Sequence, residues 1–163
     1  MKTQTIVLLF AALSTGIMSG IFFTWTNAIT PGIGKLGDMT YLSALQSMNR
    51  VILNPAFKGI FLSAVILIPM TTALNYKSSP NHIFWMLLVA TVLYGFGSFG
   101  VTIWGNIPLN NLLDNTNLDN ISAEHAKSLR ETIETKWNKF NLIRTITSIA
   151  SFVLLILTCL SNK

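Results

Sequence analysis

Four long apolar runs constrain this chain more than any other feature of its sequence. They cover residues 6–29, 57–74, 83–104 and 142–160. Each approaches or exceeds the roughly 18–20 residues that a helix needs to cross a bilayer. Apart from Lys58 at the start of the second run and Arg144 inside the fourth, the runs carry no charge. The sequence therefore predicts four transmembrane helices, with spans at approximately 5–29, 56–75, 82–105 and 140–160.

Composition supports an all-α membrane domain. Only 10% of the residues are charged, whereas ordinary soluble domains carry roughly 25%. Residues 1–163 contain no repeat or low-complexity linker, so we expect a single four-transmembrane-helix bundle, in the cytoplasmic (inner) membrane of a bacterium. An alternative interpretation of the first run is a cleavable signal peptide, because small residues at Gly16–Gly20 lie near a plausible cleavage site. Its hydrophobicity continues well past that point, which favours a retained span.

The connections between the spans differ in length. Residues 75–81 form a short connection, which predicts antiparallel neighbours. The other two connections are longer, lie on one face, and each contains a predicted amphipathic helix. In the first, Pro31 and the glycines of TPGIGKLGD end the first span, and residues 39–52 lie across the bundle mouth or on the membrane interface. In the second, Ser122 caps a helix that runs without a break into the fourth span.

Membrane orientation stays open at this stage. The face with the long connections carries eight of the eleven basic residues, which favours that face in the cytoplasm. The two-residue basic N-terminus before a strong first span favours the opposite arrangement, with both termini inside, and we prefer this second arrangement.

Several classes of function do not fit the sequence. The net charge of +5 is spread over connecting segments without a cluster of aromatic residues and arginines, so we expect no nucleic-acid partner. Cys159 is the single cysteine, and His82 and His125 lie at opposite ends of the molecule, so no metal site is expected. The stretch GFGSFG at residues 95–100 matches a dinucleotide-binding pattern, but it lies inside an apolar run. We interpret its glycines, and Gly16 and Gly20, as helix-packing positions.

Polar residues converge on the face with the long connections. They follow the first and third spans and precede the second and fourth. Asn141 and Arg144 continue an apolar stripe through Leu129, Ile133 and Trp137, so both should point into the bundle. A polar pocket at the bundle mouth is the prediction. Tryptophans near this face fit an interfacial aromatic belt at least as well as a ligand-stacking role.

Four stretches carry a resemblance to a known family. They are SGIFFTWTNAITPGIGKL after the first span, MNRVILNPAF before the second, GNIPLNNLL after the third and WNKFNLIRT entering the fourth. On these motifs the chain resembles the anthrone-oxygenase-like integral membrane proteins, a four-helix family. The resemblance implies catalytic roles for Arg144, Asn141, Asn106 and Asn110. It carries over Pro55 and implies substrate-binding roles for Asn49, Asn54, Pro108, Trp137 and Thr145, to which we add Trp104 as a residue that would flank the rings.

The resemblance also implies a reaction. Characterised members of the family oxidise polycyclic anthrones to anthraquinones with O2 and without a cofactor. Arg144 would stabilise an oxyanion, the asparagines would orient carbonyl and hydroxyl groups, and Trp104 and Trp137 would flank the rings. A general base is missing, unless His125 or Glu134 folds over the pocket.

Two alternatives to this enzyme stay open. One is a non-enzymatic membrane protein that binds or transports a small lipophilic ligand. The other is a membrane scaffold or assembly protein that presents the two amphipathic segments to a partner. The substrate and the oligomeric state do not follow from the sequence.

Overall fold

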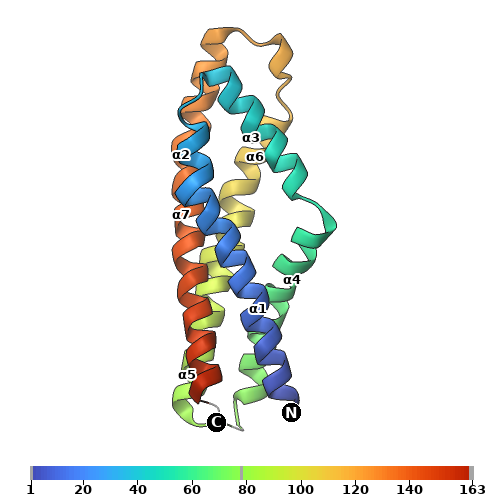
Figure 1. Cartoon of the computed structure of the whole chain (residues 1–163), viewed down its shortest axis with the longest axis vertical. Coiled ribbons are helices and arrows are strands. Elements are labelled where there is room, and N and C mark those ends of the chain that lie inside the picture. The colour runs from blue at the N-terminus through green and yellow to red at the C-terminus, as the bar shows by residue number, and fades with distance from the viewer. Residues whose placement is uncertain (1, 78, 162–163) are drawn as a thin grey trace.

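The computed structural model describes residues 2–77 and 79–161, which form four antiparallel limbs (Figure 1). The first limb is one continuous helix made of α1 (Thr3–Thr24), the π-helical η1 (Trp25–Ile29) and α2 (Thr30–Ile33). The second limb consists of α3 (Asp38–Ile52) and α4 (Pro55–Asn75).

The third limb is again continuous, and the fourth is a single helix. The third contains α5 (Asn81–Val92), the π-helical η2 (Leu93–Gly100) and η3 (Thr102–Asn106), and α6 (Ile107–Asp114). A short 3-10 turn, η4 (Leu118–Asn120), precedes α7 (Ala123–Ser161). The side-chain oxygen of Ser122 accepts a hydrogen bond from the backbone N–H of His125, as the predicted cap requires.

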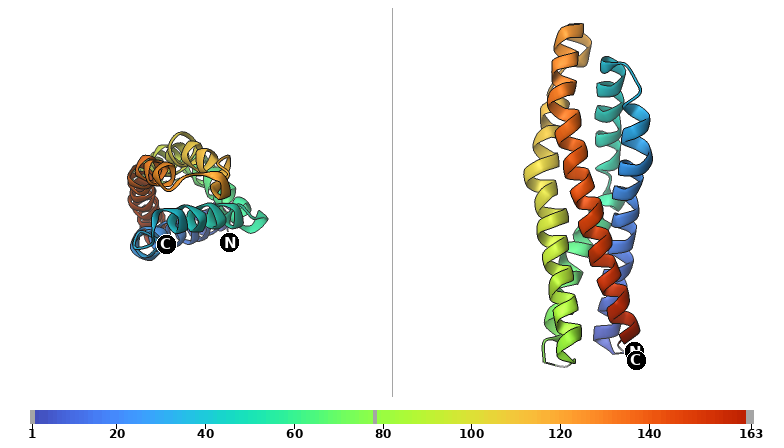
Figure 2. Two further views of the ribbon diagram at one scale, coloured as in Figure 1. Left: turned by 90° about the horizontal axis from the view of Figure 1, so that it is seen from above. Right: turned by 90° about the vertical axis from the view of Figure 1, so that its left-hand side faces the viewer.

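The predicted fold class is confirmed. The described residues contain helices and connections but no strand. Among them, four helices are long and apolar enough to cross a membrane, namely Thr3–Ile33, Pro55–Asn75, Asn81–Asp114 and Ala123–Ser161. The chain is therefore an integral membrane protein. Both long connections lie at one end of the bundle, and the chain termini and the short connection lie at the other (Figures 1 and 2).

Two prolines that should end helices do not. The first limb continues through Pro31 to Ile33, and the third continues through Pro108 to Asp114. The residue before each proline bonds to a carbonyl five residues back: Thr30 to Trp25, and Ile107 to Thr102. A proline lacks the N–H donor and its ring crowds the carbonyl of residue i−4. The wider π-turn relieves this crowding, so the helix continues.

The expectation that residues 39–52 lie across the mouth or flat on the interface is wrong. Helix α3 is the upper half of the second limb and packs against α7 and α6 (Figure 1). The limb breaks at Leu53, and α4 begins with Pro55 after Asn54, whose side chain accepts the N–H of Phe57 at 3.0 Å. At this break the limb swings away from the bundle (Figure 1).

Only some of the glycines serve helix packing. A Cβ atom on Gly16 would lie 2.9 Å from the ring of Phe152, and one on Gly97 would overlap the side chain of Thr147. These two positions bring the first and third limbs close to α7. A Cβ atom on Gly20 or Gly95 would meet no atom within 4 Å, so the packing interpretation is wrong for those two.

Candidate functional site

A cavity of about 180 Å³ lies where the second limb swings outward. Helices from all four limbs line it. A water molecule needs roughly 10–15 Å³ of such space, so the cavity can hold a small organic molecule. Its aromatic wall consists of Phe22, Trp25, Phe57, Phe61 and Trp137. Its polar lining consists of Asn49, Lys58, Thr102, Asn106, Asn110 and Arg144.

Among the residues that the structure describes, Arg144 is a buried cation without a carboxylate partner. Its Nη2 donates to Oδ1 of Asn141 at 2.7 Å, and its Nη1 donates to Oγ1 of Thr102 at 3.3 Å. The guanidinium group lies 4.5 Å from the centre of the Phe22 ring. Its Nε, also buried, has no hydrogen-bond partner. Because burying a charge costs several kcal/mol, a cation left partly unsatisfied beside a cavity indicates a place for an acceptor oxygen.

Asn141 holds Arg144 in position from behind the cavity. The Nδ2 of Asn141 donates to the carbonyl oxygen of Phe22 at 3.1 Å and to Oγ1 of Thr26 at 2.7 Å. The amide oxygen is thereby turned toward the guanidinium group. The hydroxyl of Thr145 bonds to that of Thr26 at 2.8 Å. These contacts fasten α7 to the first limb at the level of Arg144.

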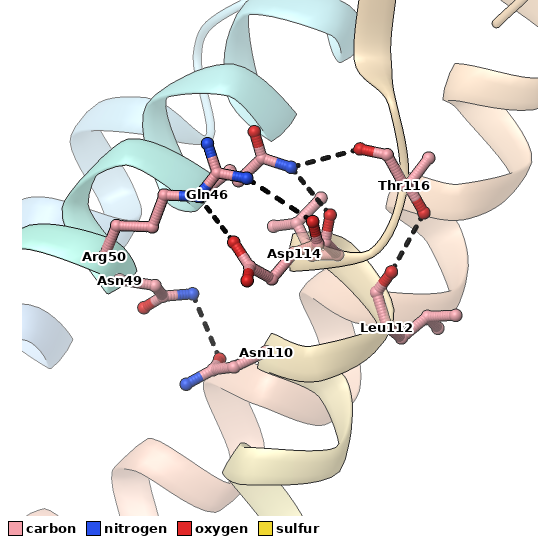
Figure 3. A network of polar contacts seen from close by, with 8 residues as sticks. Gln46, Asn49, Arg50, Asn110, Leu112, Asp114 and Thr116 are labelled. Carbon is pink, nitrogen blue, oxygen red and sulfur yellow. Dashed lines mark hydrogen bonds and ion pairs between the residues drawn. The ribbon is translucent and has the colours of Figure 1, made fainter. Parts of the chain in front are cut away.

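Asn110 joins three helices above the cavity. Its Oδ1 accepts the indole N–H of Trp137 at 2.8 Å and the Nδ2 of Asn49 at 3.0 Å; Figure 3 shows the second bond. The rings of Trp137 and Trp25 lie 5.0 Å apart. Asn106, one turn below Asn110, donates to the carbonyl oxygen of Trp137 at 3.4 Å. Its buried Oδ1, like the Nε of Arg144, has no hydrogen-bond partner among the described residues, and both residues line the cavity.

A smaller pocket of about 60 Å³ borders the cavity and shares Asn49, Leu53 and Asn110 with it. It is polar, and Arg50 and Asp114 form an ion pair at its edge (Figure 3). Gln46 donates beside this pair to the carbonyl oxygens of Leu113 and Thr116. The cavity therefore has a polar neighbour on the side of α3 and α6.

The structure brings together half of the site residues expected from the sequence. Asn49, Asn106, Asn110, Trp137 and Arg144 line the cavity. Asn141 and Thr145 are buried behind it and act through the contacts described above.

Three expected binding residues lie outside the cavity. Asn54 caps α4, Pro108 is exposed on α6, and Trp104 is 75% exposed on the outer surface. The expectation that Trp104 flanks a bound ring system is therefore wrong. His125 is also exposed, and Glu134 is paired with Arg130, so neither folds over the cavity.

The sequence reasoning missed residues from other helices. Phe22, Phe57, Phe61, Thr102 and Lys58 line the cavity but were not expected there. A signal existed for some of them, since Thr102 lies four residues before Asn106 and therefore on the same helix face. Among the described residues, no group of three or more His, Cys, Asp or Glu side chains comes together that could hold a metal ion.

Comparison with known families gives one finding. Residues 48–154 match the family model described as Anthrone oxygenase. Searches of curated proteins and of solved structures found no match. The matched segment contains all six polar residues that line the cavity. Phe22 and Trp25 of the aromatic wall precede it.

Proposed function

The chain belongs to the anthrone oxygenase family, and from that premise we propose that it oxidises a flat, lipophilic phenolic or polycyclic substrate with O2, without a cofactor, in the cavity around Arg144. The observation that carries this proposal is the buried guanidinium group, which borders the cavity and has no carboxylate partner within the described part of the chain.

The cavity suits a flat aromatic ligand. Its walls bear five aromatic rings, and the polar lining groups stand at a few fixed positions. Ligand pockets are typically apolar with a small number of oriented polar groups. A tricyclic ketone would bury its rings against Trp137, Trp25 and Phe61. Its ketone oxygen would accept from the guanidinium group of Arg144, and a hydroxyl group on its rings would donate to Oδ1 of Asn106.

Arg144 would favour the reactive form of the substrate. An anthrone is a weak carbon acid, and loss of a proton from its methylene carbon places negative charge on the ketone oxygen. A fixed cation in a low-dielectric site stabilises such an oxyanion more than the neutral ketone. Asn141 keeps the guanidinium group in place, so little reorganisation is needed when the charge develops.

The reaction balances without a cofactor. The carbanion passes one electron to O2, and the resulting radicals combine into a carbon–oxygen bond, which gives a hydroperoxide after protonation. Loss of water from the hydroperoxide breaks the oxygen–oxygen bond and the second methylene C–H bond. One oxygen atom of O2 ends in the quinone and the other in water. The methylene carbon is oxidised and O2 is reduced.

A ligand-binding or carrier function without chemistry is the second candidate. One observation favours it: among the described residues, the cavity lining contains no Asp, Glu or His that could remove the first proton. Under the oxygenase proposal, that proton passes to water in the smaller polar pocket that borders Asn49 and Asn110.

Oxygen uptake and anthraquinone absorbance with a hydroxylated anthrone test the proposal on the detergent-purified protein. Heat-denatured protein measures the spontaneous oxidation. Arg144→Met removes the cation, and Lys139→Met removes an exposed cation from the same helix as the matched control. We expect a rate above the denatured background for the unaltered protein and for Lys139→Met, but not for Arg144→Met. Anthraquinone binding without any enzymatic rate would instead establish the carrier function.

A further inference from the structure

The cavity around Arg144 is partly open to the outside of the bundle. Its exposed lining residues mark the opening. Three of the lining residues are exposed, namely Leu53, Lys58 and Ile107. Leu53 lies at the break after α3, Lys58 lies in the first turn of α4, and Ile107 begins α6. The opening therefore lies between the second and third limbs.

The second limb stands away from the bundle at this level. Every residue from 53 to 59 except Phe57 is exposed. Helix α4 has no extended contact with η3 or α6, although it packs along α1 and α5. Figure 1 shows the outward swing of the chain between α3 and α4. The exposed lining residues and the separation of α4 from α6 together indicate a lateral opening of the cavity.

Two exposed tryptophans place this opening relative to the bilayer. Trp85 and Trp104 lie on the third limb and are 59% and 75% exposed. They are 19 positions apart, which corresponds to about 28 Å of helix and matches the roughly 30 Å of bilayer hydrocarbon. Exposed apolar residues lie between them, including Val89, Val92 and Phe96. Because tryptophan favours the membrane interface, the bilayer surface lies near Trp104.

The opening lies at that surface. Thr102 and Asn106 line the cavity on either side of Trp104, and Phe57, Lys58 and Phe61 face them across it. The charged end of an exposed lysine reaches the headgroups while its stem stays in the apolar region. Lys58 at the rim fits this depth. The rim otherwise consists of Leu53 and Ile107, two exposed apolar side chains at the level of this membrane surface.

From this placement we propose that the cavity takes its ligand sideways out of the bilayer, through the opening between α4 and α6 rimmed by Leu53, Lys58 and Ile107. The inference deepens the proposed function and rests on it, because it names the phase that supplies the substrate: a flat, apolar molecule dissolved in the membrane. Such a molecule is concentrated in lipid by the hydrophobic effect. It would reach Arg144 without crossing the polar pocket edged by Arg50 and Asp114.

Labelling at single cysteines tests the route. In a Cys159→Ser background, Leu53→Cys and Ile107→Cys place a thiol on the rim; because Leu53 also lines the smaller polar pocket, the label at position 107 distinguishes the two routes. Leu112→Cys is the matched control, since Leu112 is 43% exposed on α6 but does not line the cavity. Asn111→Cys places a thiol in the smaller polar pocket. Each variant, in phosphatidylcholine–phosphatidylglycerol vesicles, is reacted with N-cyclohexylmaleimide, which adds bulk without charge.

The readout is the rate at which anthraquinone, an unreactive flat ligand, quenches the fluorescence of Trp25 and Trp137. Trp85→Phe and Trp104→Phe remove the two exposed tryptophans from the signal. We expect label at position 53 or 107 to slow quenching by at least about tenfold, as a blocked approach slows association. Label at position 111 or 112 should leave the rate within about twofold.

Each outcome decides between the proposals. Slow quenching with label at position 111, and normal quenching with label at 53 and 107, would show entry from water and overturn the lateral route. Normal quenching in all labelled variants would also overturn it. Lateral entry without oxidation of any hydroxylated anthrone would leave the route standing and refute the oxygenase. Failure of anthraquinone to quench the unlabelled protein would refute both.

Discussion

Two arginines on α7 make the most instructive comparison in this molecule. Arg130 and Arg144 are fourteen residues apart, close to four helical turns, and therefore share a face of the helix. Each guanidinium group lies 4.5 Å from the centre of an aromatic ring, that of Tyr41 for Arg130 and that of Phe22 for Arg144. Their surroundings otherwise differ in almost every respect.

Arg130 is fully engaged. It pairs with Glu134 at 2.7 Å and with Asp38 at 3.0 Å, and it donates to the carbonyl oxygens of Gly34 and Leu36. These contacts hold the connection between α2 and α3 against α7. Arg144 has two neutral acceptors, a free Nε and an adjacent cavity.

The two arginines use their charges differently. Arg130 is a structural cation, because acceptors within the protein satisfy all of its donors. Arg144 keeps its charge available, at a cost in stability that a ligand would offset. The comparison therefore predicts opposite consequences for the same substitution at the two positions.

Arg144→Met should give the largest effect. Turnover of a hydroxylated anthrone should fall by about 10²–10³-fold, because removing one group that stabilises an oxyanion typically costs that much. The free energy of unfolding should stay unchanged or rise by about 1–4 kcal/mol, since an apolar side chain replaces a buried charge. Oxygen uptake and thermal unfolding measure the two effects.

The control for this variant is Lys139→Met, which removes an exposed charge from the same helix. If Arg144→Met lowered the unfolding temperature and left anthraquinone affinity unchanged, Arg144 would be a structural cation like Arg130. The proposed difference in role between the two arginines would then be refuted.

Arg130→Met should show the opposite pattern. The free energy of unfolding should fall by roughly 1–3 kcal/mol, because the acids and carbonyl groups that Arg130 satisfies lose their donor. Turnover per folded molecule should not change. Thermal unfolding and oxygen uptake again report both quantities. Arg50→Met is the matched control, since its ion pair with Asp114 is more than half exposed and should contribute less than about 1 kcal/mol. Equal losses of unfolding free energy in the two variants would contradict the role of Arg130 in holding the connection between α2 and α3 against α7.

Thr102→Asp should make the site of Arg144 resemble that of Arg130. The hydroxyl of Thr102 lies 3.3 Å from Nη1 of Arg144, so a carboxylate there would pair with the guanidinium group. We expect affinity for a phenolate-type ligand to fall at least about tenfold, because the acid competes with the ligand for the cation. Fluorescence titration measures this, with Thr102→Asn as the uncharged control. Equal affinity in both variants would show that the ligand does not meet the charge of Arg144.

The sequence predicts well which side chains of α7 point into the bundle. The stripe through Leu129, Ile133 and Trp137 has the helical period, so the inward direction of Asn141 and Arg144 follows from spacing along one helix. The structure confirms it, since both side chains are buried. The cap at Ser122 was predictable for the same reason, because it is a local feature of one segment.

The opposite wall of the cavity was not predictable in this way. Phe22 and Thr102 lie on other limbs, and the relative rotation of two helices depends on their packing rather than on either sequence alone. The π-turns before Pro31 and Pro108 add to the difficulty. A residue inserted into such a turn rotates the helix that follows, and Trp104 itself lies within the π-helical η3.

Tyr41→Phe should give the smallest effect and isolates the aromatic ring beneath Arg130. The substitution makes that ring the same as the one beneath Arg144. It also removes a buried hydroxyl that has no hydrogen-bond partner. Near neutral pH we expect the free energy of unfolding to change by less than about 1 kcal/mol, since no made bond is lost.

The effect of Tyr41→Phe should grow at alkaline pH. Burial raises the pKa of the Tyr41 phenol above its ordinary value, and the negative charge of Glu134 acts in the same direction. The unfolded chain loses this proton at about pH 10, while the folded chain retains it, so the native state is destabilised as the pH rises above that value. Unfolding measured from pH 8 to 11 should therefore show a smaller alkaline loss of stability in Tyr41→Phe than in the unaltered protein. Tyr76→Phe, at an exposed ring, is the matched control and should keep the full loss. Identical pH profiles for all three proteins would mean that the phenol beneath Arg130 ionises freely in the folded state, and the tight packing that distinguishes this arginine from Arg144 would be absent.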